Sequence, residues 1–271
     1  MSQFFSLPLI GLVLLVVMMV VLWGISLKIR NAAVVDVGWG SAMVVLGLLY
    51  AVMSDGYLPR RVALAAMTTA WGLRLAGYLF FTRIWGQPEE GRYKQLREEW
   101  GPNADKKLLG FFLMQATVAV VMSVVVLVPA LNGAVPAGAT VAGLSLLEAG
   151  AVVVWFIGFI GEWAADNQLK RFKSAPANQG KVCTRGLWHY SRHPNYFFEW
   201  LMWVALAVFA LASPWGWLGL ISPIIITFFL FRVTGIPATE EQAVRSKGDA
   251  YRRYQRTTSA FFPWFPKEDA A

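Results

Sequence analysis

Two polar residues, Asn195 and Glu199, stand four positions apart where a basic stretch gives way to a long apolar run. Residues four apart share one face of a helix, and Pro194 suits the first position of that helix because its missing N–H would have no partner there. A carboxylate about one turn inside an apolar segment is costly to bury, so it indicates function. The pair is therefore a candidate binding site.

The residues before this pair favour an anionic ligand. A helix that begins at Pro194 offers free N–H groups and the positive end of its dipole to an anion. Arg185 and Arg192 stand close by in the sequence. His189 and His193 could ligate a metal, but no cluster of Glu, Asp or Cys accompanies them at ligand spacing. We therefore expect a helix cap and an anion contact here rather than a metal site.

Other ionisable residues interrupt apolar segments elsewhere, namely Asp36, Arg74 and Glu162. Glu162 and Asp166 are again four apart, as are Arg74 and Tyr78, so each pair shares a helical face. A polar cavity that opens to one side of a membrane would satisfy all of these residues together. The alternative is that each one reaches the interface or pairs for structural reasons.

The composition places such residues in a membrane protein. The chain has 271 residues, of which 57% are hydrophobic and 15% charged, which is too apolar for an ordinary soluble domain. A membrane-spanning helix needs about 20 apolar residues. We predict an all-α integral membrane protein whose single domain, 1–271, has seven transmembrane helices and a polar cavity that faces the cytoplasm. The predicted spans are 7–27, 33–53, 61–82, 109–131, 141–163, 195–212 and 216–235, and a tail follows over 236–271.

The positive charges predict the orientation of the spans. The 24 Lys and Arg residues lie mainly in alternate connections and in the tail, whereas the connections 132–140 and 213–215 carry none. Cytoplasmic loops are enriched in Lys and Arg, so we predict a cytoplasmic tail and an external N-terminus. This topology explains the net charge of +8 without nucleic acid, and a polyanionic partner at the same face is an additional possibility. The single cysteine, Cys183, excludes an internal disulfide.

The sequence does not have the glycine pattern of a soluble nucleotide-binding domain. No G-x-G-x-x-G follows a strand, which argues against a Rossmann domain. Gly158 and Gly161 have instead the spacing that favours close packing of membrane helices. A dinucleotide would therefore be held among membrane helices by Arg, Asn, Asp, Glu and Tyr side chains.

Several stretches together resemble the steroid 5-alpha-reductase superfamily, and most closely its bacterial branch of DUF1295-type membrane proteins. The C-terminal third is the most specific part, and the resemblance extends over nearly the whole chain. The stretches in the C-terminal third are Gly186-Leu187-Trp188, Ser191-Arg192-His193-Pro194-Asn195-Tyr196 with Glu199, Tyr251, Tyr254 and Thr257, and Phe262-Pro263-Trp264-Phe265-Pro266. The supporting matches are Asp36-Val37-Gly38-Trp39-Gly40, Trp71-Gly72-Leu73-Arg74-Leu75, Gly91-Arg92-Tyr93, and Asp166-Asn167-Gln168 before Phe172.

The resemblance implies an activity. Such proteins have seven membrane helices, bind NADPH in a cavity open to the cytoplasm, and reduce a carbon–carbon double bond conjugated to a ketone. For this chain it implies an NADPH-dependent oxidoreductase of the bacterial inner membrane. The substrate would be a lipid-like enone, a steroid or a related compound, that enters from the membrane lipids. Neither nucleic acid nor an oligomer is required, and a monomer is compatible with this expectation.

The resemblance also assigns roles to individual residues. Asp36 stands near the glutamate, and Trp71 near the tyrosine, with which the steroid enzymes grip the substrate ketone, so these two are the predicted catalytic residues. Asp36 would donate to the ketone oxygen in its protonated form. Tryptophan can donate one N–H but cannot deliver a proton as a phenol can. The predicted cofactor-binding residues are Arg74, Arg83, Arg92, Tyr93, Glu162, Asp166, Arg185, Tyr190, His193, Asn195, Tyr196, Glu199 and Arg245.

Two alternatives share some of these residues. Membrane methyltransferases that act on isoprenylcysteine or on phospholipid headgroups also carry an Arg-His-Pro stretch, and a paired glutamate followed by Tyr-x-x-Tyr in the tail. These enzymes use S-adenosylmethionine. The corresponding residues here are Glu240-Glu241 and Tyr251 with Tyr254. Asn195, Glu199, Arg74 and the Phe262-Pro263-Trp264 ending favour the reductase. The second alternative is a lipid-handling membrane protein without enzymatic activity.

Overall fold

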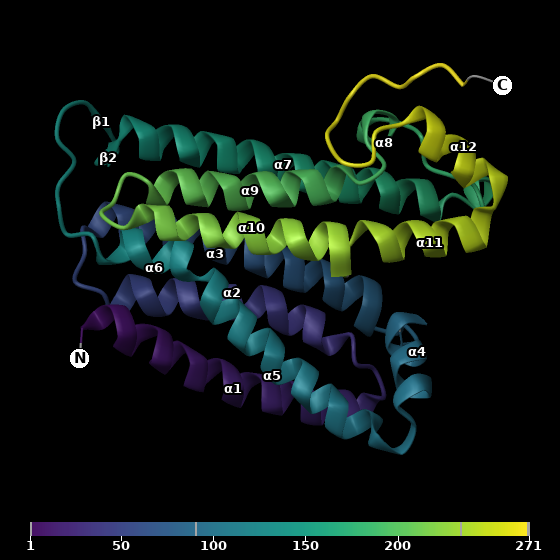
Figure 1. Cartoon of the computed structure of the whole chain (residues 1–271), viewed down its shortest axis with the longest axis horizontal. Coiled ribbons are helices and arrows are strands. Elements are labelled where there is room, and N and C mark those ends of the chain that lie inside the picture. Colours follow the sequence, from purple (N-terminus) through teal and green to yellow (C-terminus); the bar gives the residue numbers. More distant parts are fainter. Residues whose placement is uncertain (1, 90, 234, 270–271) are drawn as a thin grey trace. The chain divides into compact units, whose positions relative to one another are not determined.

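The computed structural model describes residues 2–89, 91–233 and 235–269, and these residues form an almost entirely helical chain (Figure 1). The chain divides into two compact units, which are described in turn. Unit 1 comprises 1–146 and 210–219, and unit 2 comprises 147–209 and 220–271. The prediction of a single domain remains a prediction.

Unit 1 contains the first six helices. Its long helices are rich in apolar residues, and α1 lies against both α2 and α5. A π-helical turn, Phe80–Ile84, continues α3, and a 3₁₀ turn, Gly101–Asn103, joins α4 to α5. The helices are α1 (Gln3–Ile29), α2 (Val34–Met53), α3 (Leu58–Leu79), α4 (Gly91–Trp100), α5 (Ala104–Met122) and α6 (Val124–Leu131).

Glycines allow α2 and α3 to approach closely. A Cβ on Gly40 would lie 2.8 Å from the carbonyl oxygen of Gly72, so neither position accepts a side chain without a shift of the backbone. Gly47 meets Thr68 one to two turns further along the same interface. Small residues at a helix interface let the two backbones pack tightly where lipid gives no hydrophobic driving force. This packing fixes α3 against α2, and α2 carries Asp36 in its first turn.

The predicted span 109–131 consists of two helices that meet at Ser123. The Ser123 hydroxyl donates to the carbonyl oxygen of Val120 at 2.7 Å and lies 2.8 Å from the hydroxyl of Tyr50 on α2. A serine that bonds back to the preceding turn bends or interrupts a helix. The break therefore has a local cause, and the buried Tyr50 hydroxyl has its partner there.

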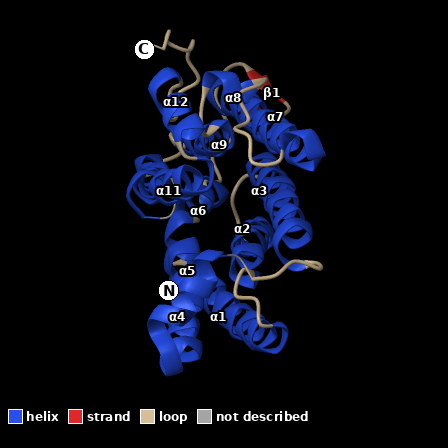
Figure 2. Ribbon diagram, turned by 90° about the vertical axis from the view of Figure 1, so that its right-hand side faces the viewer, coloured by secondary structure: helices blue, strands red, loops and turns tan. Residues whose placement is uncertain are grey.

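A short β-hairpin, with two residues in each strand, precedes α7. The sequence predicted that a membrane span starts within this hairpin, at residue 141. Strands β1 (Thr140–Val141) and β2 (Leu144–Ser145) pair antiparallel, and Figure 2 shows this strand segment in red. Ala142 and Gly143 both have positive φ, 52° and 80°, which is typical of a type I′ turn. The start of that predicted span is therefore wrong, because α7 begins at Leu146.

Unit 2 contains the remaining helices. A 3₁₀ turn, Pro176–Asn178, follows α7, and a π-helical turn, Phe229–Val233, follows α10. The helices are α7 (Leu146–Ser174), α8 (Leu187–Tyr190), α9 (Pro194–Ala210), α10 (Ile221–Phe228), α11 (Ile236–Lys247) and α12 (Asp249–Thr257). Helix α7 continues beyond the predicted end of the fifth span at residue 163 and ends at Ser174. The prediction that Glu162 and Asp166 share one helix is confirmed.

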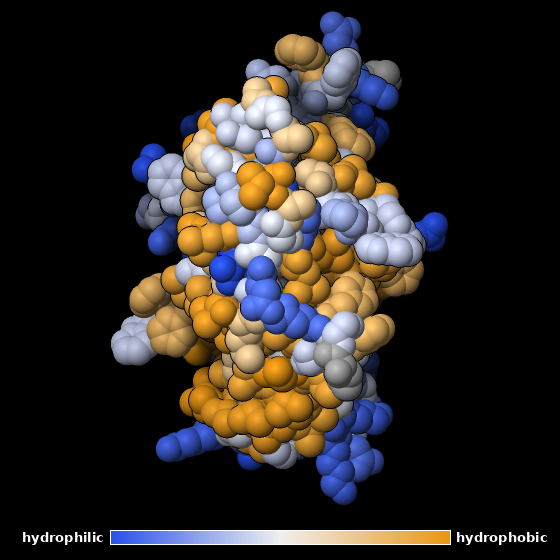
Figure 3. Space-filling view, turned by 90° about the vertical axis from the view of Figure 1, so that its left-hand side faces the viewer, coloured by the Kyte–Doolittle hydropathy of each residue, from blue (hydrophilic) through white to orange (hydrophobic). Residues whose placement is uncertain are grey.

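Five helical segments among the described residues are long and apolar enough to cross a membrane: Gln3–Ile29, Val34–Met53, Gly91–Leu131, Leu146–Ser174 and Gly216–Lys247. Apolar side chains cover much of the surface drawn in Figure 3, as helices that face lipid require. The other two predicted spans correspond to α3, which carries Arg60, Arg61 and Arg74, and to α9, which has 17 residues. The chain is thus an all-α, multi-pass membrane protein, and seven spans remain a prediction.

Candidate functional site

In unit 1, the carboxylate of Asp36 gathers three predicted site residues. Arg83 Nη1 donates to Asp36 Oδ2 at 2.8 Å, and Arg92 Nη2 lies 3.3 Å from Oδ1. The hydroxyl of Tyr93 donates to Oδ1 at 2.7 Å, and Arg92 Nη2 donates to that hydroxyl at 2.6 Å. We call Asp36, Arg83, Arg92 and Tyr93 the Asp36 cluster. The structure therefore brings together four of the residues that the sequence selected from three separate segments.

The backbone around the Asp36 cluster is held by side chains that the sequence reasoning missed. The amide of Asn31 donates to the carbonyl oxygen of Arg83 at 2.9 Å, and Glu89 Oε1 accepts from the backbone N–H of Ala32 at 2.8 Å. Arg97 pairs with Glu89 at 3.0 Å. These bonds fix the loop before α2 to the π-helical turn that carries Arg83, and such turns occur frequently at functional sites.

The carboxylate of Asp36 is the common acceptor of this cluster. Arg83, Arg92 and Tyr93 all donate to it, so it positions two guanidinium groups. The predicted role of Asp36 as a donor to a substrate ketone remains a prediction. The side chains of Arg83 and Arg92 are 35% and 34% exposed, so both guanidinium groups are accessible to a ligand.

Trp71 and Arg74 lie further back along α3. Trp71 is buried and stands beside Gly72 in the α2–α3 interface, and Arg74 is half-buried. Arg74 precedes Arg83 by nine residues, or roughly 13 Å along a helix at 1.5 Å per residue. The predicted roles of Trp71 and Arg74 remain predictions.

In unit 2, α7 and α9 pack closely and carry the second group of predicted residues. A Cβ on Gly158 would lie 2.9 Å from the carbonyl oxygen of Phe198, and one on Gly161 would overlap the ring of Phe198. The sequence-based interpretation of these glycines as packing residues is thereby confirmed. Close approach of the two helices places Asp166 of α7 next to Asn195 of α9, and Asn195 Nδ2 donates to Asp166 Oδ1 at 3.4 Å.

Two further carboxylates flank this contact. Glu162 is buried one turn before Asp166 on α7, and Glu199 is half-buried one turn after Asn195 on α9. The distance of 3.4 Å between the Asn195 amide and Asp166 is longer than that of most N–H···O bonds. We call Glu162, Asp166, Asn195 and Glu199 the α7–α9 polar group. Its carboxylates can accept hydrogen bonds from a bound molecule, and its amide can both donate and accept them.

Arg192, just before α9, forms a separate network in unit 2. Its Nε donates to Glu240 Oε1 at 2.6 Å, and its Nη1 donates to the carbonyl oxygens of Gln255, at 2.9 Å, and of Thr258. Its backbone N–H donates to the carbonyl oxygen of Ser259 at 2.8 Å. We call Arg192, His193, Glu240, Tyr254 and Gln255 the Arg192 cluster. One guanidinium thus joins the beginning of α9 to α11 and to the segment that follows α12.

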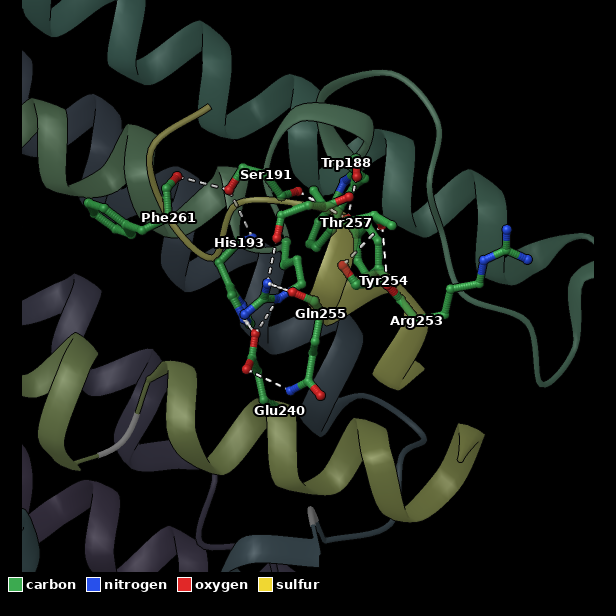
Figure 4. Close-up of polar contacts among 11 residues, drawn as sticks. Trp188, Ser191, His193, Glu240, Arg253, Tyr254, Gln255, Thr257 and Phe261 are labelled. Carbon is green, nitrogen blue, oxygen red and sulfur yellow. Dashed lines mark hydrogen bonds and ion pairs between the residues drawn. The ribbon is translucent and has the colours of Figure 1, made fainter. Parts of the chain in front are cut away.

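Other side chains complete this network (Figure 4). His193 Nε2 lies 3.2 Å from Glu240 Oε1, and Gln255 Nε2 donates to Glu240 Oε2 at 2.9 Å. The hydroxyl of Tyr254 donates to the carbonyl oxygens of Trp188 and Ser191. The side chains of the Arg192 cluster therefore bind mainly one another and nearby backbone carbonyl oxygens, which indicates a structural role.

Burial and hydrogen bonds around Arg192 shift the pKa of Glu240 and of the neighbouring Tyr251. α11, with Glu240, Glu241, Arg245 and Lys247, is polar and follows the apolar part of its span. Burial raises the pKa of Glu240, but hydrogen bonds from His193, Arg192 and Gln255 outweigh burial and lower it to about 2. Burial also raises the pKa of Tyr251 to about 12. Glu240 is therefore ionised at neutral pH and Tyr251 is protonated.

A short segment that resembles the superfamily positions α8 on α7. Gly186 has a φ of 60° and lies against the side chain of Gln168, whose Oε1 accepts from the backbone N–H of Leu187 at 2.8 Å. The indole N–H of Trp188 donates to the carbonyl oxygen of Ala165 at 2.9 Å. A positive φ favours glycine, so Gly186-Leu187-Trp188 has a structural explanation in this chain.

The remaining predicted residues of unit 2 differ in exposure. Arg185, Tyr190 and Arg245 are exposed, and Arg245 pairs with Glu241 at 2.5 Å. The rings of His193 and Tyr196 stack with centroids 5.3 Å apart. His193 thus belongs to the Arg192 cluster, whereas Arg185 and Arg245 present their charges to solvent.

Sequence reasoning quoted several residues of the Arg192 cluster without finding their role. Glu240 and Tyr254 attracted attention as motif residues, but their contacts with Arg192 and Ser191 span more than 45 positions of sequence. Thr258 contributes through its backbone carbonyl oxygen, so its side-chain type gave no signal, and the side chain of Gln255 binds Glu240, which is 15 positions away. Asn31 and Glu89 were missed because each binds a backbone group.

The helices, their apolar surfaces and these polar groups define the class of the protein as an α-helical, multi-pass membrane protein. Among the described residues, no group of three or more His, Cys, Asp and Glu side chains could hold a metal. A family model matches residues 22–258, and its description is "Protein of unknown function (DUF1295)". The chain belongs to the DUF1295 family. No curated protein and no solved structure matches the chain.

Proposed function

We propose that this protein uses NADPH to reduce a carbon–carbon double bond conjugated to a ketone in a lipid-like substrate. The observation that carries the proposal is the α7–α9 polar group, in which Asn195 and Asp166 meet and Glu162 and Glu199 stand one turn away. Carboxylates in membrane helices are costly and indicate function. The resemblance of the chain to the steroid 5-alpha-reductase superfamily supplies the reaction.

The chemistry of the residues in unit 2 fits a dinucleotide. The carboxamide of a nicotinamide ring has both a donor and an acceptor, which match the amide of Asn195 and the carboxylates of Asp166 and Glu199. Phosphate groups are bound by guanidinium groups, and Arg185 and Arg245 are exposed in the same unit. When it is bound, NADPH supplies the hydride, and the protein binds and orients it.

In this proposal the Asp36 cluster stabilises negative charge. Donors aimed at an oxygen that gains charge lower the barrier of a reaction, and Arg83 and Arg92 are partly exposed guanidinium groups of this kind. Asp36 positions both arginines and leaves them as the groups that contact the ligand. Trp71 is retained as a substrate contact. The tail is proposed to lie on the cytoplasmic side of a bacterial inner membrane.

The Arg192 cluster does not favour the methyltransferase alternative. Arg192, His193, Glu240 and Tyr254 are the residues that this chain shares with such enzymes, and in this structure they bind one another and the backbone. Their presence is explained by the position of α9 and requires no S-adenosylmethionine. The residues that distinguish the reductase, Asn195 and Glu199, are not part of that network of described contacts.

The purified protein in mild detergent tests the proposal. We expect oxidation of NADPH that depends on an enone lipid, with mass spectrometry detecting a product two hydrogens heavier. Asn195→Ala should abolish most of this activity, and Asp249→Asn, a change at an exposed residue paired with Arg252, is the matched control. Co-purified S-adenosyl compounds would support the methyltransferase, and the absence of turnover with a series of steroid, polyprenyl and fatty enones would count against the reductase.

A further inference from the structure

Three large aromatic side chains are exposed in the segment 261–266, which follows α12. Phe262, Trp264 and Phe265 are 58%, 71% and 73% exposed. Phe261 of the same segment is buried. Exposed apolar residues that gather in one place mark a surface that contacts a partner or a membrane.

The backbone of this segment is fixed, so the exposure is a property of the fold. The hydroxyl of Ser191 donates to the carbonyl oxygen of Phe261 at 2.9 Å. The backbone N–H of Trp264 donates to the carbonyl oxygen of Tyr190, also at 2.9 Å. On the far side of the aromatic residues, the N–H of Lys267 donates to the carbonyl oxygen of Thr257 at 2.7 Å.

The same segment lies beside the first turns of α9. The ring centroid of Phe262 is 5.8 Å from those of both Phe197 and Trp200 on α9. Phe265 packs edge-on against Tyr190, just before α9, with centroids 5.8 Å apart. The exposed aromatic residues are therefore placed at the end of an apolar helix and not far out on a polar surface.

The neighbouring helix shows where the bilayer boundary falls. α7 is a candidate membrane span and packs on α9 through Gly158 and Gly161. Trp163 on α7 is 56% exposed and lies one turn before Asn167, near the level of the Asp166–Asn195 contact. Tryptophan and tyrosine concentrate at the two membrane–water interfaces, so Trp163 and the segment 261–266 fit one interfacial layer.

The charges of unit 2 favour lipid phosphates as the partner of this surface. Residues 167–192 include six Lys and Arg and no acidic residue. Five of the six are exposed, namely Lys170, Arg171, Lys173, Lys181 and Arg185, whereas Arg192 pairs with Glu240. A second copy of this chain would bring like charges together at the same face, whereas phospholipid headgroups would compensate them.

We propose that Phe262, Trp264 and Phe265 insert into the headgroup region of the bilayer beside the first turns of α9. The exposed basic residues of 167–185 then face the lipid phosphates. Insertion holds the segment 261–266 against α9 from the lipid side, while Ser191 and Tyr190 hold it from the protein side. This surface is independent of the proposed reductase activity, and its test uses no substrate or nucleotide.

A single-cysteine probe tests this insertion, because Cys183 is the one cysteine of the chain. Phe265→Cys is placed in a Cys183→Ala background, labelled with a polarity-sensitive fluorophore and reconstituted into phosphatidylcholine–phosphatidylglycerol vesicles. Glu268→Cys, at an exposed charged position three residues on, is the matched control. We expect the label at 265 to emit at shorter wavelength and to be quenched by lipids brominated near the headgroup. The label at 268 should be quenched by aqueous iodide.

Two results would overturn the proposal. In the first, the label at 265 is quenched by iodide as strongly as the label at 268. In the second, the label at 265 is shielded from both quenchers, which would place protein over it. If the Cys183→Ala background does not fold, the tryptophan fluorescence of the wild type is compared with that of Trp264→Phe. We expect brominated lipids to quench the part of the emission that Trp264→Phe removes, and a lack of such quenching would overturn the proposal.

Discussion

The Asp36 cluster and the Arg192 cluster use the same kinds of residue in different ways. In each cluster a carboxylate binds arginine, and a tyrosine hydroxyl donates nearby. The side chain of Arg192 is 10% exposed, and its Nη1 group donates to backbone carbonyl oxygens. Arg83 and Arg92 are more than three times as exposed. Burial, rather than residue type, therefore separates a structural ion pair from a group that can bind a ligand.

This difference changes the meaning of the Arg192-His193-Pro194 signature. The signature is the most visible motif of the chain, but its charged residues hold α9 to α11 and to the segment after α12. Asn195 and Glu199 stand on the helix that these contacts position. Proteins with different reactions could share the signature for the same structural reason, so it identifies an arrangement of helices and not a reaction.

The largest expected effect is on stability, in the Arg192 cluster. Arg192→Ala leaves Glu240 without its guanidinium partner, and breaking a buried ion pair costs about 3–5 kcal/mol. We expect the unfolding midpoint in detergent to fall accordingly, whether it is followed by temperature or by denaturant. Arg192→Lys keeps the positive charge but loses the planar fork of the guanidinium group. Its unfolding midpoint should therefore lie between those of the wild type and Arg192→Ala. Wild-type stability in Arg192→Ala would show that the cluster is not structural.

The pH dependence of stability should come from Glu240. Because its pKa in the folded state is lowered to about 2, its contribution is present above the unfolded pKa of about 4.3. That contribution is lost as the pH falls from there toward 2. We expect Glu240→Gln to flatten the acid limb of unfolding curves measured in this range. An acid limb as steep as that of the wild type would assign the dependence to other carboxyl groups.

Removing one hydroxyl from the same cluster should have a smaller effect. Tyr254→Phe leaves the carbonyl oxygens of Trp188 and Ser191 without this donor, and an unmade buried hydrogen bond costs about 1–3 kcal/mol. Denaturant titration measures the change. Tyr190→Phe, which removes a hydroxyl from an exposed tyrosine of the same unit, is the matched control. A loss of stability in Tyr254→Phe no larger than in Tyr190→Phe would argue against a role for the Tyr254 bonds.

The smallest effect on stability is expected in the Asp36 cluster. Asp36→Asn weakens contacts with partly exposed arginines, and such pairs contribute about 0–1 kcal/mol. Turnover of an enone substrate should nevertheless fall, because Arg83 and Arg92 lose the carboxylate that positions them. Unfolding curves and initial rates on the same preparation separate the two effects. A large loss of stability with normal turnover would reverse the comparison between the clusters.

The helical architecture could be predicted because lipid demands continuous apolar helices, and the apolar runs are visible in the sequence. The limits of the helices depend on local details that hydropathy does not contain. The Ala142-Gly143 turn moves the start of α7 to Leu146. Ser123 divides another span through bonds to Val120 and Tyr50. The predicted span ends at residue 163 because the apolar character of α7 fades before the helix ends at Ser174.

The candidate site was predictable in its members and only partly in its chemistry. Spacing on a helix selected Asn195 with Glu199 and Glu162 with Asp166, and the Asn195–Asp166 contact joins the two pairs. The contacts of Asp36 could not be deduced because they involve Arg83 and Arg92, which lie 47 and 56 positions away. The function of Arg192 depends on backbone carbonyl oxygens, which every residue type supplies.

The central claim is that Asn195 binds a nucleotide cofactor and that the adjacent Arg192 is structural. Calorimetric titration of the detergent-solubilised protein with NADPH tests it most directly, with Asn195→Ala compared with the wild type and with Asp249→Asn. We predict that Asn195→Ala weakens NADPH binding about tenfold or more, which corresponds to roughly 1.4 kcal/mol, while its unfolding midpoint and the binding to Asp249→Asn stay unchanged. Wild-type affinity in Asn195→Ala, or no binding of NADPH to the wild type, would contradict the account.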